Sequence, residues 1–327
     1  MEMLELNNLH KTFNPGTVNE KVALNGVSLH MEAGDFATIV GSNGAGKSTM
    51  FNAITGGFIA DEGSISLADE DITFMPEHER SRRIGRLFQD PLRGTAPSMT
   101  IEENLALAYL RAAHGNPFSR ISKKDKDFFA EQLKQLGMGL EDRMKNPVGL
   151  LSGGQRQALT LLMATMVPPQ LLLLDEHTAA LDPASSTLVF ETLREANRAL
   201  GITIVVVEQK VALLSEYCNR VLVLNHGEIA LQGEPHEVFA HADELRAIGV
   251  DCPRVTRIFN SLEADGLASG TPCLDVDEAE RLITGIVDPA HASSDIQAPA
   301  GSPHAPSLCP HAKDAEPVLT FDHVEFA

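Results

Sequence analysis

A glycine-rich run between two regular patterns restricts the possible folds of this 327-residue chain more than any other feature. The apolar stretch Phe36–Val40 predicts a short buried strand, and the breaker-free stretch Lys47–Ile54 predicts a helix. Joining them is the segment Gly41, Ser42, Asn43, Gly44, Ala45, Gly46, Lys47, Ser48 and Thr49. Glycine, four residues and then Gly-Lys-Ser is the pattern of a strand–loop–helix unit that binds phosphate. This order favours an α/β fold with a mainly parallel sheet.

Each residue type in this loop has a physical role toward a polyphosphate. Glycines let the backbone N–H groups turn inward, and the start of the helix adds a positive dipole potential. Lys47 is expected to reach the β and γ phosphates, and the Ser48 hydroxyl to bind Mg²⁺. A Gly-rich turn without a ligand is the alternative, which the strand and helix on either side disfavour.

Two adjacent carboxylates follow a second apolar strand, predicted at Leu171–Leu174. At the end of that strand Asp175 would hold the Mg²⁺ through water, and Glu176 would activate the attacking water as a base. On its own, an acidic pair at a strand end is as easily a solvated surface feature. The phosphate loop earlier in the chain favours the catalytic interpretation.

A third motif, Leu151-Ser152-Gly153-Gly154-Gln155, precedes a predicted helix whose N-terminus could contact a γ-phosphate. With the two earlier motifs in this order, it resembles the signature sequence of ABC-type ATPases over roughly residues 3–235. The resemblance implies a P-loop NTPase fold with a parallel core sheet, an antiparallel β subdomain and a helical signature subdomain at about 90–166. It implies ATP hydrolysis coupled to transport, with the ATPase domain spanning residues 1–240.

The resemblance also implies roles for residues outside these three motifs. Gln89 would sense Mg²⁺ and face the membrane partner, Asp182 would lie in the loop that crosses the dimer interface, and Phe13 would stack on adenine. A core phenylalanine at a strand end is the alternative for Phe13. In the family, Ser152, Gly153, Gly154 and Gln155 of one subunit complete the ATP site of another, so two copies clamp two nucleotides head to tail.

Two positions depart from the family pattern. Gln209 stands where a histidine usually contacts the γ-phosphate, and glutamine cannot become cationic, so slow but real hydrolysis is one hypothesis. An adequate glutamine is the equally weighted alternative. His177 follows Glu176 where most relatives have proline, and it is interpreted as a packing variant rather than a switch.

The motif spelling points to two branches of the family. The segments Thr12–Thr17, Ser98–Leu105 and Asp175–Pro183 resemble amino-acid importers of the tryptophan or tyrosine type. The segments Glu208–Lys210, Gly233–Phe239 and Gly249–Thr256 resemble energy-coupling-factor ATPases, which serve vitamins or metal ions. In that branch a C-terminal helical segment, here about 241–288, aids dimerisation.

The end of the chain has a different composition. Residues 289–317 hold 6 of the 18 prolines and 3 of the 12 histidines, which indicates a flexible linker. The strand predicted within 318–327 repeats the pattern of Leu4–Leu9, so it is interpreted as the start of a second ATPase copy, with an unrelated β segment as the alternative.

Composition and charge limit the classes of function. With 45 acidic against 26 Lys and Arg residues, the chain carries a net charge of −19, which argues against nucleic-acid binding. No apolar run approaches the ~20 residues of a membrane span and no signal peptide is recognisable, so a cytoplasmic protein on the inner face of the membrane is expected. Expected partners are a transmembrane permease, a second ATPase subunit or tandem copy, and in some systems a solute-binding subunit. A soluble ABC ATPase without a transport role, or a degenerate module with a weak site, are the alternatives.

Overall fold

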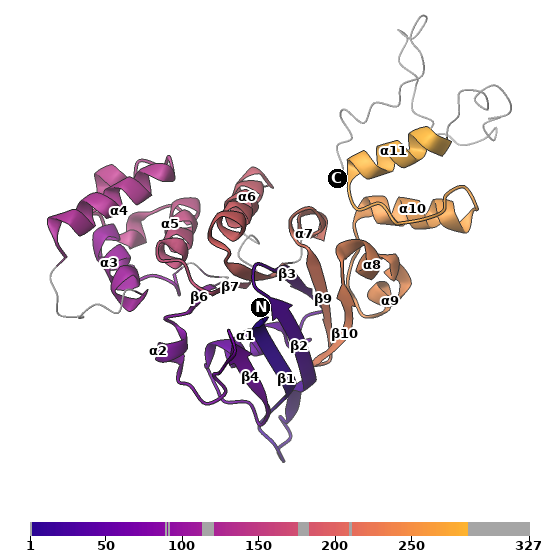
Figure 1. The fold of residues 1–327 in the computed structure, drawn as a ribbon, viewed down its shortest axis with the longest axis horizontal. Helices are drawn as coiled ribbons and strands as arrows, with labels where there is room; N and C mark the ends of the chain where they lie inside the picture. Colours follow the sequence, from indigo (N-terminus) through magenta and orange to yellow (C-terminus); the bar gives the residue numbers. More distant parts are fainter. Residues whose placement is uncertain are drawn as a thin grey trace, which may run out of the picture. The chain divides into compact units, whose positions relative to one another are not determined.

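The computed structural model describes residues 2–88, 90, 92–112, 121–175, 183–208 and 211–286 (Figure 1). Its larger sheet has six strands in the order β10-β9-β3-β8-β7-β6. Five of them are parallel and β10 pairs antiparallel with β9. The strands are β3 (Phe36–Val40), β6 (Ile84–Leu87), β7 (Leu171–Asp175), β8 (Thr203–Val207), β9 (Arg220–Asn225) and β10 (Glu228–Gly233).

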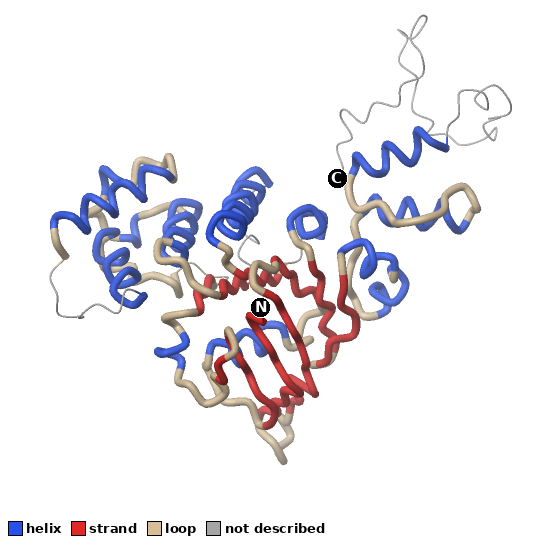
Figure 2. Tube along the Cα trace, viewed as in Figure 1, coloured by secondary structure: helices blue, strands red, loops and turns tan. Residues whose placement is uncertain are grey.

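A second, antiparallel sheet has the order β2-β1-β4-β5 (Figure 2). Its strands are β1 (Glu2–Phe13), β2 (Lys21–Glu32), β4 (Glu62–Leu67) and β5 (Glu70–Asp71). Helix α1 (Lys47–Thr55) shares an apolar cluster with this sheet, and the short α2 (Glu77–Arg80) follows β5.

The apolar strands of the larger sheet are buried on both faces, as expected of a parallel sheet. Leu171 and Leu173 of β7 belong to the cluster that includes α1 and the antiparallel sheet, whereas Leu172 and Leu174 belong to a second cluster. That second cluster includes residues of α6 (Pro183–Leu200) and α7 (Val211–Tyr217). Because side chains alternate along a strand, one continuous apolar run supplies both layers of the core.

Helices α3 (Ile101–Ala112), α4 (Lys123–Gln135) and α5 (Gly153–Thr165) form a group with an apolar cluster of its own (Figure 1). Two short 3₁₀ helices, η1 (Glu141–Arg143) and η2 (Val148–Leu150), connect α4 to α5. The capping box at Ser122 begins α4, since Ser122 and Asp125 each accept a hydrogen bond from the other's backbone.

The C-terminal part of the described chain is helical: α8 (Pro235–Ala240), α9 (Ala242–Ala247), α10 (Arg254–Ala264) and α11 (Val276–Ile286). Leu274, just before α11, is buried in the same apolar cluster as Phe239 and Val250. His236 Nε2 lies 3.0 Å from Glu278 Oε1, which connects α8 to α11. Through these contacts the last two helices are attached to the larger domain.

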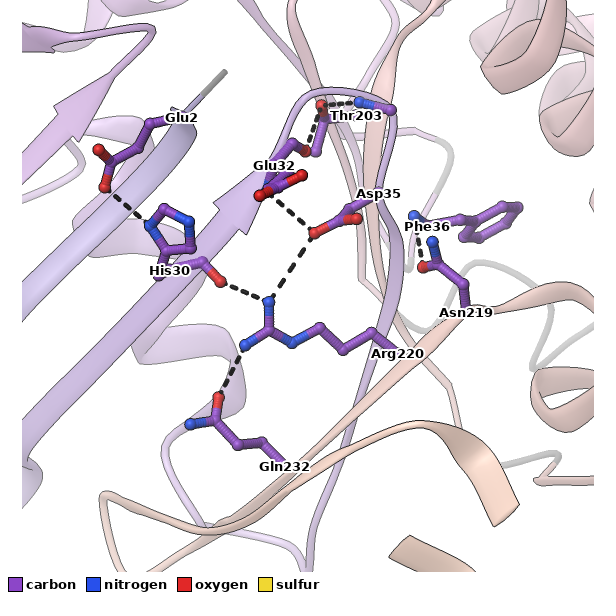
Figure 3. A network of polar contacts seen from close by, with 10 residues as sticks. Glu2, His30, Glu32, Asp35, Phe36, Thr203, Asn219, Arg220 and Gln232 are labelled. Carbon is purple, nitrogen blue, oxygen red and sulfur yellow. Dashed lines mark hydrogen bonds and ion pairs between the residues drawn. The ribbon is translucent and has the colours of Figure 1, made fainter. Parts of the chain in front are cut away.

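A polar network around Arg220 connects the start of β9 to the end of β2 (Figure 3). The Arg220 guanidinium donates to the His30 carbonyl oxygen at 2.5 Å and to Gln232 Oε1 at 3.1 Å, and lies 3.8 Å from Asp35. Asp35 in turn accepts a hydrogen bond of 2.9 Å from the Glu32 backbone N–H. The network fixes the turn that leads into β3, the strand before the glycine-rich loop.

The sequence patterns predicted most of these elements, with shifted ends. Strand β3 has the predicted bounds, whereas α1 ends at Thr55 instead of Ile54 and β7 ends at Asp175 instead of Leu174. Helix α5 begins at Gly153 because Ser152 caps it and both glycines take helical positions. The predicted linker and last strand, 289–327, lie outside the described residues.

None of the helices in the described ranges is long and apolar enough to cross a membrane. The three cysteines that fall within these ranges, Cys218, Cys252 and Cys273, are all buried as free thiols. Burial raises the pKa of the Cys218 thiol far above its ordinary value, so it is unreactive at neutral pH.

Candidate functional site

The register of the larger sheet brings the glycine-rich loop and Asp175 to the same edge. Val207 of β8 is paired with Ile39 of β3 on one side and with Asp175 of β7 on the other. Because all three strands are parallel, their carboxyl ends coincide, and Gly41 and Asp175 flank the end of β8. Ligands bind at this edge in open α/β sheets.

Glycines 41 and 46 allow the loop to lie directly against the backbone of neighbouring strands. A Cβ at Gly41 would stand 2.3 Å from the Leu224 carbonyl oxygen, and one at Gly46 would stand 2.5 Å from that of Ala23. Gly46 also has a φ of 111°, which side chains other than glycine rarely adopt. The glycine spacing of the motif is therefore required by packing as well as by phosphate chemistry.

Hydrogen bonds hold the loop in place around Lys47. The Lys47 ammonium donates to the carbonyl oxygens of Gly41 at 2.7 Å and Ser42 at 3.0 Å, and the side chain is largely buried. The Gly227 N–H, in the turn between β9 and β10, donates to the Ala45 carbonyl oxygen at 2.9 Å. These bonds pre-organise the loop, which reduces the entropy lost when a ligand binds.

A cavity of about 160 Å³ lies beside the loop. Its lining includes six residues of the motif and two from β2, namely Asn43, Gly44, Gly46, Lys47, Ser48, Thr49, Lys21 and Ala23. The Lys21 ammonium lies 3.8 Å from the position of a Cβ on Gly44. Two lysines therefore face one small polar cavity, which suits a polyanion.

Asp175 lies between the loop and a partly buried arginine, Arg86. The Ser48 hydroxyl donates to Asp175 Oδ1 at 3.4 Å, and Arg86 Nη2 lies 3.8 Å from Asp175 Oδ2. Burial lowers the pKa of the Arg86 guanidinium, and the charge of Asp175 partly offsets this effect. A hydroxyl and a carboxylate oxygen side by side are donors that Mg²⁺ prefers, so these two residues fit that ion.

The second predicted phosphate contact is at the start of α5. Gln155 N–H donates to Ser152 Oγ, and Ser152 N–H donates to Gln155 Oε1, each at 3.2 Å. Ser152, Gly153 and Gly154 are exposed, and the described residues place nothing within 4 Å of a Cβ on either glycine. This chain alone gives no packing reason for glycine there, which fits an approach by an external group.

The aromatic ring of Phe13 is partly exposed at the end of β1. It contacts Phe58 edge-on, with 5.5 Å between the ring centroids, and Lys11 Nζ lies 5.8 Å from the Phe13 centroid. At 36% exposure Phe13 is not a core residue, so a face of the ring is accessible for stacking.

Comparison with known proteins agrees with this geometry. The sequence profile described as ABC transporter matches residues 24–179. A tyrosine transport ATP-binding protein of Clostridioides difficile is 38% identical over 240 residues, covering 72% of this chain and 93% of the relative. The chain belongs to the ABC transporter ATP-binding family.

Two further relatives extend the similarity of this ABC ATPase. An energy-coupling factor transporter ATP-binding protein of Clostridium perfringens is 31% identical over 270 residues, 82% of this chain and 92% of the relative. The methionine import ATP-binding protein of Salmonella typhimurium is 34% identical over 242 residues, 73% of this chain and 67% of the relative.

Solved structures confirm the predicted fold class. The cbiO1 protein of Clostridium perfringens, part of the ABC transporter complex cbiONQ, has a TM-score of 0.63 and 27% identity, covering 80% of this chain and 99% of its own. A dimeric ATP-binding cassette in a post-hydrolysis state with ADP and Pi has a TM-score of 0.62 and 26% identity, and the match covers 71% of this chain and 99% of that cassette. The ABC ATPase described here is therefore an ATP-binding, ATP-hydrolysing protein.

Four predicted site residues of the ABC ATPase lie outside the described residues, namely Gln89, Glu176, Asp182 and Gln209, and so does His177, the predicted packing variant. Two residues beside the loop and Asp175 were not predicted as part of the site. Lys21 gave no signal because it is a single lysine at a strand start. Arg86 has a sequence signal, a cation inside the apolar stretch Ile84–Phe88.

Proposed function

We propose that this ABC ATPase powers solute import by hydrolysing Mg²⁺-ATP at sites shared between two ATPase units. The single observation that carries the proposal is the cluster of Lys47, Ser48 and Asp175 at one sheet edge, in and beside a loop whose glycines pack against neighbouring strands. Its relatives are named as transport or import ATP-binding proteins.

Within each site the loop amides and Lys47 bind the phosphates, with Lys21 beside them. Ser48, Asp175 and Gln89 would hold Mg²⁺, which neutralises phosphate charge when bound. Glu176, directly after Asp175, would accept a proton from the attacking water. Gln209 would donate a hydrogen bond toward the γ-phosphate, and Phe13 would stack on the adenine.

The other half of each site would come from a second ATPase unit. Ser152, Gly153, Gly154 and Gln155 at the start of α5 would contact its γ-phosphate, and Asp182 would lie at the interface. Support comes from the exposed N-terminus of α5 and from the relative solved as a dimer. Head-to-tail pairing would let both sites close at once.

A membrane permease would dock beside the stretch Gln89–Glu103. A cleft of about 290 Å³ lies there, lined by residues of β6, the following loop, α3 and α5. It includes Arg93 and the exposed Leu107, and the neighbouring Leu92 is also exposed. A cleft with exposed apolar and basic side chains suits a short helix of a partner protein. The ATPase would then work on the inner face of the membrane.

We propose an amino acid as the solute, because the relative with 38% identity is named for tyrosine. A vitamin or metal ion is the second candidate, since the energy-coupling factor relative aligns over 270 residues and reaches into the C-terminal helices. That alignment also supports a role of residues 241–288 in dimerisation.

The decisive experiment is purification of the tagged full-length ATPase with its membrane partners, followed by reconstitution into liposomes. Import of a labelled aromatic amino acid that requires ATP, and is lost in Lys47→Ala, supports the proposal. Uptake of a vitamin or of Co²⁺ instead would select the second candidate. Absence of any polytopic partner, with ATP hydrolysis intact, would favour a soluble role.

A further inference from the structure

Arg86 is a partly buried cation that the proposed catalytic roles leave unused. It stands on β6, the edge strand next to β7, and its side chain is only 15% exposed. A buried charge is costly unless it is paired and hydrogen-bonded, so the contacts that retain it are informative.

The guanidinium connects the loop helix to Asp175. Arg86 Nη1 donates to Asn52 Oδ1 at 2.7 Å and to Thr55 Oγ1 at 3.2 Å, both on α1. The guanidinium also lies over the Phe88 ring, 4.7 Å from its centroid. Held on these sides, Arg86 presents Nη2 to Asp175 Oδ2 at 3.8 Å.

The two oxygens of Asp175 are thus divided between two neighbours. Oδ1 accepts from Ser48, on the side of the phosphate loop, and Oδ2 faces Arg86. A partial rotation of the carboxylate about its Cβ–Cγ bond would move Oδ1 away from Ser48 and Oδ2 away from Arg86. The guanidinium of Arg86, which is hydrogen-bonded to α1, therefore sets the direction in which Asp175 Oδ1 points. That direction is toward Ser48, which also lies on α1.

We propose that Arg86 is a positioning residue that aims Asp175 at the Mg²⁺ of the bound nucleotide. The proposal rests on the proposed function, since it assumes that Asp175 and Ser48 hold the ion. Two effects oppose one another: a nearby cation repels Mg²⁺, whereas a fixed carboxylate binds it better. At 3.8 Å from the outer oxygen, Arg86 acts mainly by fixing the carboxylate, because Asp175 lies between it and Ser48.

The test separates metal binding from nucleotide binding in the purified full-length chain. Fluorescence of N-methylanthraniloyl-ATP gives the affinity in EDTA, and an Mg²⁺ titration of the same sample gives the ion concentration at half-saturation. Arg86→Met is expected to raise that concentration roughly tenfold, as loss of a residue that orients a metal ligand does. The affinity in EDTA should not change.

Three variants make the result specific. Asn52→Ala removes one hydrogen-bond partner of the guanidinium but keeps its charge, so it should raise the half-saturating Mg²⁺ concentration by less than Arg86→Met does. Arg86→Lys keeps the positive charge but loses the paired contacts, and it too should give a rise smaller than that of Arg86→Met. Arg83→Met is the matched control, because Arg83 is half-buried just before β6 but pairs with Glu70 and Gln170, and it should leave the Mg²⁺ requirement unchanged.

An Mg²⁺ requirement in Arg86→Met equal to or below that of the wild type overturns the proposal, since the guanidinium would then act only by repulsion. If Arg86→Met does not fold, unchanged requirements in both Asn52→Ala and Arg86→Lys overturn it. Failure of the proposed function has a different outcome: Asp175→Asn would keep the wild-type Mg²⁺ requirement.

Discussion

Gly46 shows how one backbone position determines whether the phosphate loop can form. Gly46 and Gly34 both have positive φ angles, 111° and 86°, but only Gly46 would place a Cβ against another backbone, 2.5 Å from Ala23 O. We expect Gly46→Ala to lower the free energy of unfolding by about 3 kcal/mol, because backbone strain and the clash with Ala23 O add up. Gly34→Ala should lower it by about 1 kcal/mol, because backbone strain is then the only cost. Urea denaturation measures both, and equal losses would show that the contact with Ala23 can relax.

Gln209 stands where the family resemblance leads us to expect a histidine. A charge-assisted hydrogen bond stabilises by about 1 kcal/mol more than a neutral one, so Gln209→His is expected to raise the turnover number roughly fivefold. The rate of phosphate release at saturating Mg²⁺-ATP checks this, compared between pH 6 and pH 8. Unchanged turnover at both would mean that glutamine serves the γ-phosphate as well as histidine.

Helix α5 has two exposed glycines in its first turn. Gly153 occupies a helical position in which no described residue would touch a Cβ, so Gly153→Ala should stabilise the fold by about 0.5–1 kcal/mol. The same change should lower ATP hydrolysis at least tenfold if a nucleotide of the second unit approaches there. Thermal unfolding and an ATPase assay on one preparation give both values. A Gly153→Ala protein that is more stable and fully active would show that this turn does not contact the nucleotide.

The C-terminus of α1 depends on a buried arginine. Arg80 is 1% exposed and donates to the carbonyl oxygens of Ala53, Ile54, Thr73 and Met75. Arg80→Met leaves these oxygens without that donor, so the free energy of unfolding is expected to fall by about 3–5 kcal/mol. Arg82→Met is the matched control, since Arg82 is exposed and its loss should stay within about 0.5 kcal/mol. Equal urea midpoints for the two variants would contradict the capping role.

Local pattern predicted the elements better than it predicted the contacts between them. The apolar runs of β3 and β7 and the glycine spacing before α1 are visible in the sequence because burial and backbone conformation restrict each residue type locally. The partners of Arg80 and Arg86 could not be predicted, since the carbonyl oxygens of α1 and the carboxylate at the end of β7 are brought near them only by the folded sheet. Lys21 beside the loop was missed for the same reason.

At the scale of the whole molecule, the proposed function requires one chain to supply two complementary halves of an ATP site. The phosphate loop and Asp175 lie at the edge of the larger sheet, whereas Ser152 begins a helix in the separately packed group α3–α5. Each half would be completed by a second unit in a head-to-tail arrangement. Binding of ATP between the two units and closure of the dimer would then be the same event. Affinity for the second unit should then depend on bound nucleotide, because binding of one ligand is linked to binding of the other.

This linkage predicts the mass of the ATPase in solution. In Glu176→Gln, which would bind ATP but hydrolyse it slowly, sedimentation with Mg²⁺-ATP should show a particle of twice the monomer mass, and with ADP mostly monomer. Adding Ser152→Arg should abolish the ATP-dependent dimer, since a long side chain there would occupy the space of the γ-phosphate. Arg198→Ser is the control and should keep the dimer, because Arg198 is exposed in the last turn of α6, outside both the proposed nucleotide interface and residues 241–288. A dimer that forms equally with ATP, with ADP and with Ser152→Arg would mean that pairing is held by other surfaces, such as the C-terminal helices, and not by the shared nucleotide.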